Sequence, residues 1–384
     1  MAGVKHEVLG LDFAGFEALV VTLPSGRGVA GKVYARAFEC GRLDFEGLGL
    51  AARSVAAYEN AFGVSLLEVR RTVEEEGEFG ATVKAVMACR DGAEVECVLI
   101  PMPPRADGHK RATICLSSQV GCRMACSFCE TGHGGLLRDL EAAEIVAQLV
   151  TARVRLGWES GNVVFMGMGE PLDNLENLLA ALKVLTERRG LGISWERITV
   201  CTSGIVPGIE ALRERGHRRL NLSLSLNAAD DETRSRLMPV NRRWSLASLA
   251  IALAAYPGRR NFVLALNWCL LPGINDGPAD ARAAAAFVSS LRRGEGRPRA
   301  LFNLIPYNPG SRPLARAPSD AEVAAFAALL EAEGCQVRTR SRKGSLIMAA
   351  CGQLGAARFL PSALSDRSGT GPSPPAAEMK GPAS

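Results

Sequence analysis

Apolar runs of strand length alternate with amphipathic stretches of helical length from about residue 112 onward. The short runs are rich in Val, Ile, Leu and Phe, whereas the longer stretches repeat apolar residues every three or four positions. The pattern predicts helices at 139–156, 174–189, 245–255, 279–293 and 319–334. It predicts strands at 113–118, 162–167, 197–201, 220–226, 262–271, 300–306 and 335–340.

Repeated strand–helix units form a parallel sheet with helices outside it. We therefore expect an α/β fold in which residues 106–361 form a partial or complete (β/α) barrel. In such a barrel the functional residues belong at the carboxyl ends of the strands and in the loops that follow them. The segment 362–384 is rich in Pro, Ser, Gly and Ala, which predicts a disordered tail.

The region before the barrel has a different pattern. Residues 1–105 are expected to form a small N-terminal accessory region, with a helix around 55–62. Alternating apolar positions over 83–100 predict a β-hairpin, and Asp91-Gly92 is its turn signal.

Composition narrows the class of protein. The chain is 47% hydrophobic with a net charge of +5, which allows a large core and is compatible with an RNA partner without requiring one. No apolar run reaches the roughly 18 residues that a membrane helix needs, and the N-terminus lacks the pattern of a secretory signal. We expect a cytoplasmic protein with no membrane segment.

Four of the eleven cysteines are crowded into fifteen residues, which indicates metal or redox chemistry rather than a disulfide framework. The spacing C-x3-C-x2-C lets Cys122, Cys126 and Cys129 ligate three irons of a 4Fe-4S cubane and leave the fourth iron open for a ligand. A zinc site is the alternative, and it would need a fourth protein ligand such as His133. We interpret other cysteines as small buried hydrophobes, namely Cys40, Cys89, Cys269 and Cys335.

A glycine-rich segment, GMGEPL at 167–172, directly follows a predicted strand. Glycines let the backbone approach a ligand closely, and the carboxylate of Glu170 can accept hydrogen bonds from an amino group. A tight turn that merely ends the strand is the alternative interpretation.

Seven sequence blocks together resemble the RlmN/Cfr family of radical S-adenosylmethionine (radical SAM) enzymes, which methylate adenosine in RNA. In chain order they are CLSSQVGCRMACSFCETG, VVFMGMGEPLDN, TSGIVPGI, ETRSRLMPVNRR, GIND, NLIPYNP and AACGQLG. The resemblance covers about residues 95–356 and is weaker over the N-terminal region. It implies a barrel of the radical SAM type, a 4Fe-4S cluster on the three cysteines, and SAM as cofactor.

The resemblance also implies roles for individual positions. Cys351 would accept a methyl group from SAM and carry it to the base, and Cys115 would resolve the adduct by forming a disulfide with Cys351. Glu96 would accept the ring proton. The SAM site would be lined by Gly169, Glu170, Cys201, Ser225, Leu226, Asn227 and Asn308.

The implied reaction suits this machinery. Position 2 of adenine is an electron-poor carbon that does not attack a methyl sulfonium, whereas a radical can add to it. The resemblance therefore implies methylation at position 2 in 23S rRNA, with tRNA as an additional candidate substrate. It also implies an electron donor such as flavodoxin or ferredoxin. Methylation at position 8 uses the same cysteines and stays open.

Several positions depart from the family pattern. The family usually has Ser where Cys201 stands and His where Asn227 stands. An acidic pair is missing within 341–348, and the segment 78–86 also differs. These departures keep open a radical SAM enzyme that acts on a small molecule or a peptide. An iron–sulfur protein with only a structural or RNA-binding role is a further alternative.

Basic runs at 213–219, 241–244, 292–299 and 338–343 are candidate contacts for RNA phosphates, although each is also compatible with ordinary surface charge. Aromatic residues make up only 5% of the chain, so we expect no broad stacking platform for single strands. A target adenosine must leave its stack to reach a buried cluster. Recognition of a folded RNA loop with an accessible base is the expected mode.

Overall fold

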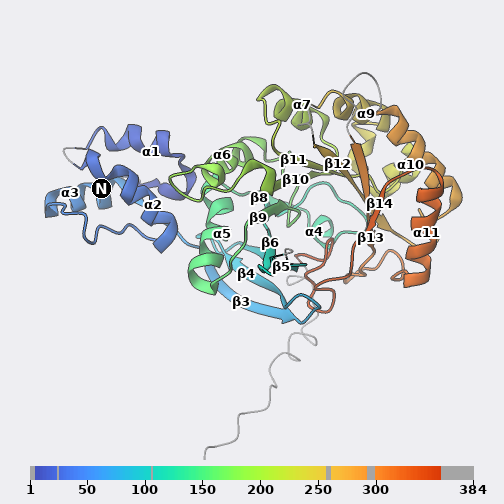
Figure 1. The fold of residues 1–384 in the computed structure, drawn as a ribbon, viewed down its shortest axis with the longest axis horizontal. Coiled ribbons are helices and arrows are strands. Elements are labelled where there is room, and N and C mark those ends of the chain that lie inside the picture. Colours follow the sequence, from blue (N-terminus) through green and yellow to red (C-terminus); the bar gives the residue numbers. More distant parts are fainter. Residues whose placement is uncertain (1–4, 24–25, 105–106, 257–260, 292–298, 356–384) are drawn as a thin grey trace, which may run out of the picture.

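One ten-stranded sheet organises the molecule in the computed structural model, which describes residues 5–23, 26–104, 107–256, 261–291 and 299–355 (Figure 1). Its strand order is β14-β13-β12-β11-β10-β9-β6-β5-β4-β3. Because β14 and β3 are the two edges, the sheet is open, and the structure has a partial barrel. The tail expected at 362–384 lies outside the described residues.

Every neighbouring pair in the part of the sheet ordered β6-β9-β10-β11-β12-β13-β14 is parallel, as the repeated strand–helix pattern predicts. All seven strands predicted after residue 112 are present among them. They are β6 (Arg111–Cys115), β9 (Asn162–Phe165), β10 (Ile198–Thr202), β11 (Asn221–Ser225), β12 (Val263–Leu270), β13 (Arg299–Pro306) and β14 (Val337–Thr339).

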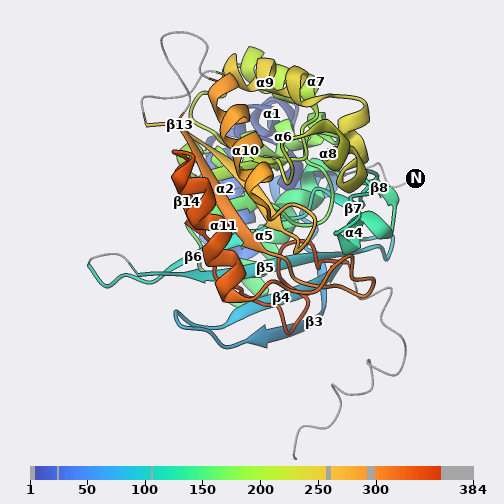
Figure 2. The ribbon, with the colours of Figure 1, turned by 90° about the vertical axis from the view of Figure 1, so that its right-hand side faces the viewer.

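Helices cover the outer face of this sheet, so the apolar stripes of the helices and the apolar strand positions form one continuous core (Figures 1 and 2). The predicted helices are present as α5 (Ala142–Leu156), α6 (Leu175–Thr186), α9 (Leu246–Ala254), α10 (Pro278–Ser290) and α11 (Asp320–Ala332). Shorter helices complete the barrel: α4 (Glu130–His133), α7 (Val206–Glu214), α8 (Asp231–Leu237) and the 3-10 turns Trp195–Arg197 and Pro239–Arg242.

The described residues between 5 and 63 form a helical unit beside the barrel, at the left of Figure 1. Its core is aromatic: Phe16 lies with its ring centroid 4.7 Å from that of Phe62 and 5.3 Å from that of Tyr34. The elements are β1 (His6–Glu7), a 3-10 turn (Val8–Gly10), α1 (Phe13–Val20), a 3-10 turn (Arg27–Val29), α2 (Ala30–Cys40), α3 (Ala52–Ala61) and β2 (Phe62–Gly63).

The predicted hairpin is present as β4 (Thr82–Ala88) and β5 (Glu94–Met102), and β3 (Glu68–Glu75) pairs with β4 on its other side. β5 also pairs with β6 in antiparallel fashion, with Val98 opposite Cys115. The boundary expected at 105/106 therefore falls between two neighbouring strands of one sheet. This pairing places the hairpin against the part of the barrel that carries the cysteines.

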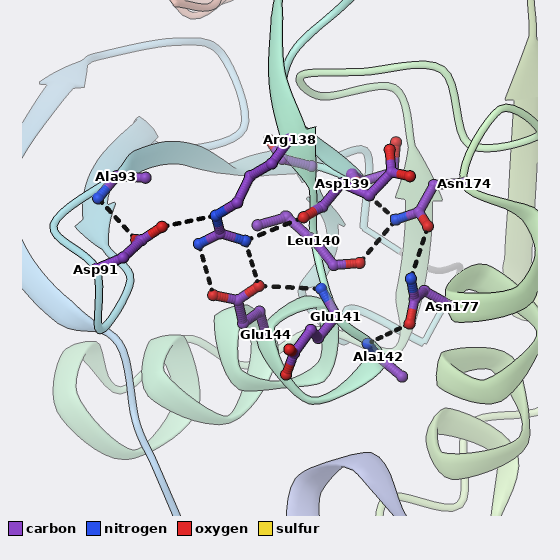
Figure 3. A network of polar contacts seen from close by, with 12 residues as sticks. Asp91, Ala93, Arg138, Asp139, Leu140, Glu141, Ala142, Glu144, Asn174 and Asn177 are labelled. Carbon is purple, nitrogen blue, oxygen red and sulfur yellow. Dashed lines mark hydrogen bonds and ion pairs between the residues drawn. The ribbon is translucent and has the colours of Figure 1, made fainter.

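Arg138 fastens the hairpin turn to the barrel (Figure 3). It lies on β8 (Leu136–Asp139), which pairs with β7 (Gln119–Gly121). Its guanidinium donates to Asp91 at 2.7 Å and to both carboxylate oxygens of Glu144 at 2.7 and 2.9 Å. The hydrogen bond to Arg138 lowers the pKa of Asp91 to about 2, so this carboxylate is charged at neutral pH.

The described part of the chain contains no helix that is long and apolar enough to cross a membrane.

Candidate active site

One cavity at the carboxyl ends of the parallel strands collects most of the predicted site residues. It is lined by loops that follow β6, β9, β10, β11, β12 and β13, and by the C-terminal segment that contains Cys351. The predicted residues in its wall are Cys122, Cys126, Cys129, Gly169, Glu170, Cys201, Ser225, Asn227 and Cys351.

The three motif cysteines lie in a tight loop between β7 and α4. Ala125 has a left-handed backbone with φ of 52°, which turns the chain between Cys122 and Cys126. A side chain at Gly132 would lie 3.0 Å from the backbone N of Cys126, so α4 packs directly against this loop. The loop is therefore shaped by local backbone conformation and by a close helix contact.

These cysteines fit a cluster better than a single metal ion. They are free thiols in one cavity, and desolvation together with the charges of Cys129 and Cys122 raises the pKa of Cys126. Thiolates crowded in this way require a cationic group between them. Among the described residues, no three His, Cys, Asp or Glu side chains converge on one ion. A cubane needs no such convergence, because each thiolate binds a different iron.

His133, the fourth zinc ligand suggested by the sequence, does not line the cavity of the three thiols. The Nε2 atom of His133 lies 3.0 Å from the carbonyl oxygen of Ser127, so the ring is held against the backbone of the cysteine loop.

The glycine-rich loop after β9 is wedged against the segment that leads from β6 to the cysteines. Gly169 has φ of +98°, and a Cβ there would lie 2.7 Å from the backbone N of Gln119. A Cβ at Gly167 would lie 2.6 Å from the carbonyl oxygen of Leu116. Only glycine fits at either position, so the loop is more than a simple turn that ends a strand.

Glu170 is buried in the cavity wall, where its carboxylate joins two loops. One oxygen accepts the N–H of Leu172 at 3.1 Å, and the other accepts the N–H of Ser203 at 2.7 Å. Desolvation raises the pKa of Glu170, and these backbone donors oppose the shift. The carboxylate keeps further lone pairs toward the cavity, so it can also receive an ammonium group there.

Cys201 lies at the centre of a row of polar side chains inside the barrel. Its sulfur accepts from the amide of Asn267 at 3.2 Å and lies 3.5 Å from the hydroxyl of Ser225. The same Asn267 amide donates to Ser223 at 2.9 Å, and Asn303 donates to its carbonyl at 3.1 Å. Asn267 was missed by sequence reasoning, although an Asn inside the apolar run 262–271 was a usable signal.

Asn227 contributes mainly backbone to the cavity. It has φ of +59°, a conformation that Asn tolerates better than most residues. Its side-chain carbonyl accepts the N–H of Cys269 at 2.8 Å, and its amide points to the sulfur of Met238 at 3.2 Å. The backbone is engaged as well: its N–H donates to the carbonyl of Asn267 at 3.2 Å, and its carbonyl accepts from the amide of Asn275 at 2.7 Å. The second lone pair of that carbonyl is the backbone acceptor left for a ligand.

Two predicted SAM-site residues are not in the cavity wall. Leu226 is fully buried, and its backbone N–H donates to the carbonyl of Asn267 at 3.0 Å. Asn308 is buried after β13, and its amide donates to the carbonyl of Pro306 at 3.2 Å. Both lie next to the cavity in the chain, and their proposed contacts with SAM stay predictions.

Cys351 and Cys115 come from distant parts of the chain, and the charge of one influences the pKa of the other. Cys115 ends β6 and is buried; desolvation and the charge of Cys351 raise its pKa. Cys351 is exposed to solvent when the whole residue is considered, but protein surrounds its thiol. Desolvation therefore raises the pKa of this thiol, and the Arg340 guanidinium opposes part of the shift. Cys115 is not part of the cavity wall that contains Cys351, so their roles as resolving and carrier cysteines stay predictions.

Glu96 lies on β5, behind the Cys351 segment rather than in the wall of the cysteine cavity. It lines a neighbouring small cavity together with Met168 and Gly355. One carboxylate oxygen accepts the N–H of Gly355 at 2.8 Å, and the other lies 3.5 Å from the ammonium of Lys84. Its role as a proton acceptor stays a prediction.

The position of Cys269 shows that its interpretation from the sequence was wrong. It was expected to be a small buried hydrophobe, but it lies in the cavity wall with the cluster cysteines and Cys351. Desolvation and the charges of Cys351 and Cys129 raise its pKa. Side chains two apart on a strand share a face, so Cys269 follows Asn267 into the barrel interior.

The matches with known proteins agree with this geometry. Residues 116–284 match the Radical SAM superfamily. A radical SAM methyltransferase from Sphaerobacter thermophilus superposes with a TM-score of 0.81 at 34% identity, over 92% of this chain and 100% of that one. The superfamily match includes the cysteine loop and the glycine-rich loop.

Curated relatives narrow the family further. The dual-specificity RNA methyltransferase RlmN of Phenylobacterium zucineum is 41% identical over 82% of this chain and 80% of its own length. The RlmN of Nitratidesulfovibrio vulgaris is 38% identical over 92% of this chain and 95% of its own. The chain belongs to the RlmN family. Its cofactors, as a member of the RlmN family of radical SAM enzymes, are a 4Fe-4S cluster and SAM.

Proposed function

We propose that this chain methylates position 2 of an adenine in RNA, and that the methyl group is first placed on Cys351. The proposed RNA is 23S rRNA, with tRNA as a second substrate. The observation that carries the proposal is that Cys351 lines the cavity of the three motif cysteines and lies within electrostatic range of Cys115. A radical SAM enzyme that did not use a protein-bound methyl group would need neither cysteine at this place.

When bound, the cluster and SAM supply the methyl group and the one-electron chemistry that an electron-poor ring carbon requires. Cys122, Cys126 and Cys129 would hold the cluster, and Glu170 would receive the amino group of SAM. The backbone of Asn227 and the side chains of Cys201 and Ser225 would line the remainder of the SAM site.

The protein's own groups then have separate tasks. The Cys351 thiolate accepts the methyl group by displacement. That methyl group must lose one hydrogen atom through the one-electron chemistry that the cluster and SAM would supply, and the sulfur then holds the remaining carbon as it joins the adenine ring. Glu96 accepts the proton that the ring carbon loses. The Cys115 thiolate attacks the sulfur of Cys351, so that a disulfide forms while the carbon–sulfur bond breaks. The freed carbon takes a proton and becomes the product methyl group.

The substrate base must leave its stack, because the cavity lies at the ends of the barrel strands rather than on a flat surface. A reductant such as flavodoxin or ferredoxin would deliver electrons to the cluster. The Cys115–Cys351 disulfide must take up two electrons and two protons from a reductant before the next turnover. The protein would act in the cytoplasm, where rRNA and tRNA are available.

The test compares two variants that should fail at different steps. Cys351→Ala should form no protein-bound methyl group and no methylated RNA. Cys115→Ala should accept the methyl group, join it to RNA and then stall, because the thiolate that breaks the carbon–sulfur bond is missing. Protein purified from cells should then carry covalently attached RNA, which nuclease digestion and mass spectrometry would trace to one adenosine.

Cys97→Ala is the matched control, since Cys97 is buried on β5, next to the strand that carries Cys115. It should turn over and release free RNA. Normal turnover by Cys115→Ala would refute the mechanism. The trapped nucleotide would also show whether the carbon is attached at position 2 or at position 8 of adenine. If a small molecule or a peptide is found attached instead, that molecule and not RNA is the substrate.

A further inference from the structure

The segment that carries Cys351 has no regular secondary structure after β14, yet it is fixed on both sides of the cysteine. The ammonium of Lys84 donates to the carbonyl of Met348 at 2.9 Å, three residues before Cys351. The N–H of Gly355, four residues after Cys351, donates to Glu96 at 2.8 Å. Both partners belong to the hairpin β4–β5 and not to the barrel strands.

Lys84 and Glu96 also form a pair with each other. They lie diagonally on adjacent strands, because Val86 is the direct partner of Glu96. Their side chains are only 4% and 3% exposed, with 3.5 Å between the ammonium and the carboxylate. Burying two charges is unfavourable unless further hydrogen bonds satisfy them. Here the Cys351 segment supplies those further bonds, one to each member of the pair.

The segment itself is held in a conformation that it would not adopt freely. Met348, the residue whose carbonyl Lys84 binds, has φ of +54° although it is not glycine. Gly352 and Gly355 have φ of +85° and +90°. Backbone of this kind persists only where surrounding contacts determine it. Residues of α4 also hold this segment, because the hydroxyl of Thr131 donates to the carbonyl of Leu354 at 2.7 Å. Lys84 and Glu96 supply the contacts that come from the hairpin.

We propose that Lys84 and Glu96 act as a clasp on the Cys351 segment, with Lys84 as a positioning residue for Cys351. Closure of the clasp holds the thiol at the cluster cavity. The same closure occupies one oxygen of Glu96 with the N–H of Gly355, so displacement of the segment frees that oxygen. The proposal rests on the proposed function, in which Glu96 accepts the ring proton, and it links the position of Cys351 to the availability of that base.

The clasp is tested first without catalysis, on the cluster-loaded protein. Lys84→Met should raise amide hydrogen exchange in 344–355 and the rate at which iodoacetamide alkylates Cys351, each by about tenfold, because a buried charged donor is lost. Lys183→Met, at an exposed position on α6, is the control for loss of a charge and should change neither rate. Unchanged exchange and alkylation in Lys84→Met would overturn the proposal.

Glu96 supplies a second pair of variants if Lys84→Met folds poorly. Glu96→Gln keeps an oxygen that can accept the N–H of Gly355, so exchange in 344–355 should stay within about threefold of the wild type. Glu96→Ala removes that acceptor and should raise exchange as Lys84→Met does. Equal exchange in Glu96→Gln and Glu96→Ala would contradict a clasp. It would mean that the oxygen retained in glutamine does not hold the N–H of Gly355.

Activity separates this proposal from the reaction mechanism. Lys84→Met should slow the methylation of Cys351, measured as the mass gain of one methyl group on the protein. Glu96→Gln should methylate Cys351 at the normal rate and form no RNA product. A Glu96→Gln enzyme that forms product would refute Glu96 as the base while leaving the exchange results, and with them the clasp, in place.

Discussion

Single residues in this cavity differ in whether their side chains are free to act. Cys201 and Ser225 direct polar atoms toward the cavity, whereas Asn227 uses both ends of its amide within the protein. The departures from the family pattern at Cys201 and Asn227 therefore have different consequences. The departure at Cys201 changes an atom that a ligand can contact. The departure at Asn227 changes a side chain that stabilises the protein through internal hydrogen bonds.

Asn227→Ala should lower the free energy of unfolding by about 1–3 kcal/mol, because the N–H of Cys269 loses its acceptor and alanine disfavours φ of +59°. SAM affinity should change by less than about tenfold, since the proposed contact is through the backbone. Urea unfolding and equilibrium SAM binding measure the two effects. Asn227→Gly separates them further, because glycine accepts the backbone conformation and lacks only the side chain.

A loss of SAM binding much greater than the loss of stability in Asn227→Ala would contradict this interpretation. It would mean that the Asn227 side chain itself contacts SAM.

At the scale of elements, the loops after β6 and β9 work as one unit. The side chain of Gln119 accepts the N–H of Glu170 at 2.8 Å and donates to Asp139 and Asp173 at 2.7 and 2.9 Å. The amide of Gln148 on α5 pairs with both backbone groups of Ser117 at 2.9 Å. The glycine-rich loop and the segment that leads to the cluster cysteines are therefore held in fixed relation.

Gly169→Ala should weaken SAM binding by at least about tenfold and destabilise the protein by more than about 2 kcal/mol, because the new Cβ meets the backbone of Gln119 as well as an unfavourable φ. Gly157→Ala is the matched control: Gly157 ends α5 with φ of +66° and has no atom within 4 Å of the added Cβ. It should cost about 1 kcal/mol and leave SAM binding unchanged.

Unfolding in urea and SAM titration of both glycine variants provide the comparison. Similar losses of SAM affinity in the two would indicate that backbone strain alone, and not the contact between the loops, is responsible.

Across the whole molecule, basic residues differ in whether their charge is available to RNA. In the run 213–219, Arg215 pairs with Glu176 at 2.8 Å and Arg219 with Glu196 at 2.7 Å. In the run 338–343, Arg340 is exposed and close enough to Cys351 to influence its pKa. Most of the run 292–299 lies outside the described residues. Arg340 is therefore the basic residue of these runs whose charge acts on Cys351.

Arg340→Ala should weaken RNA binding by about tenfold at low salt. The slope of log affinity against log salt concentration should also fall by about the amount expected for the loss of one phosphate contact. Arg215→Ala should have little effect, because the charge of Arg215 is already balanced by Glu176. RNA binding measured over a range of salt concentrations distinguishes the two variants. Equal losses would mean that the basic runs contribute only their overall charge.

The sequence by itself determined the features that depend on neighbouring residues. Apolar periodicity located the parallel strands and the major helices, and Asp91-Gly92 located the hairpin turn. The spacing of Cys122, Cys126 and Cys129 indicated a cluster, because three ligands within eight residues need little help from the rest of the fold. These signals are local, so they survive without knowledge of the packing.

The tertiary structure decided which distant residues meet. Only packing shows that β5 continues the barrel sheet, that Cys269 belongs to the cavity wall, and that Lys84 and Glu96 hold the segment of Cys351. Lys84 and Met348, which lies three residues before Cys351, are 264 residues apart, and no periodicity in either segment records that separation. Their contact arises because the hairpin pairs with β6 and the C-terminal segment lies against that hairpin. Both arrangements are properties of the assembled core.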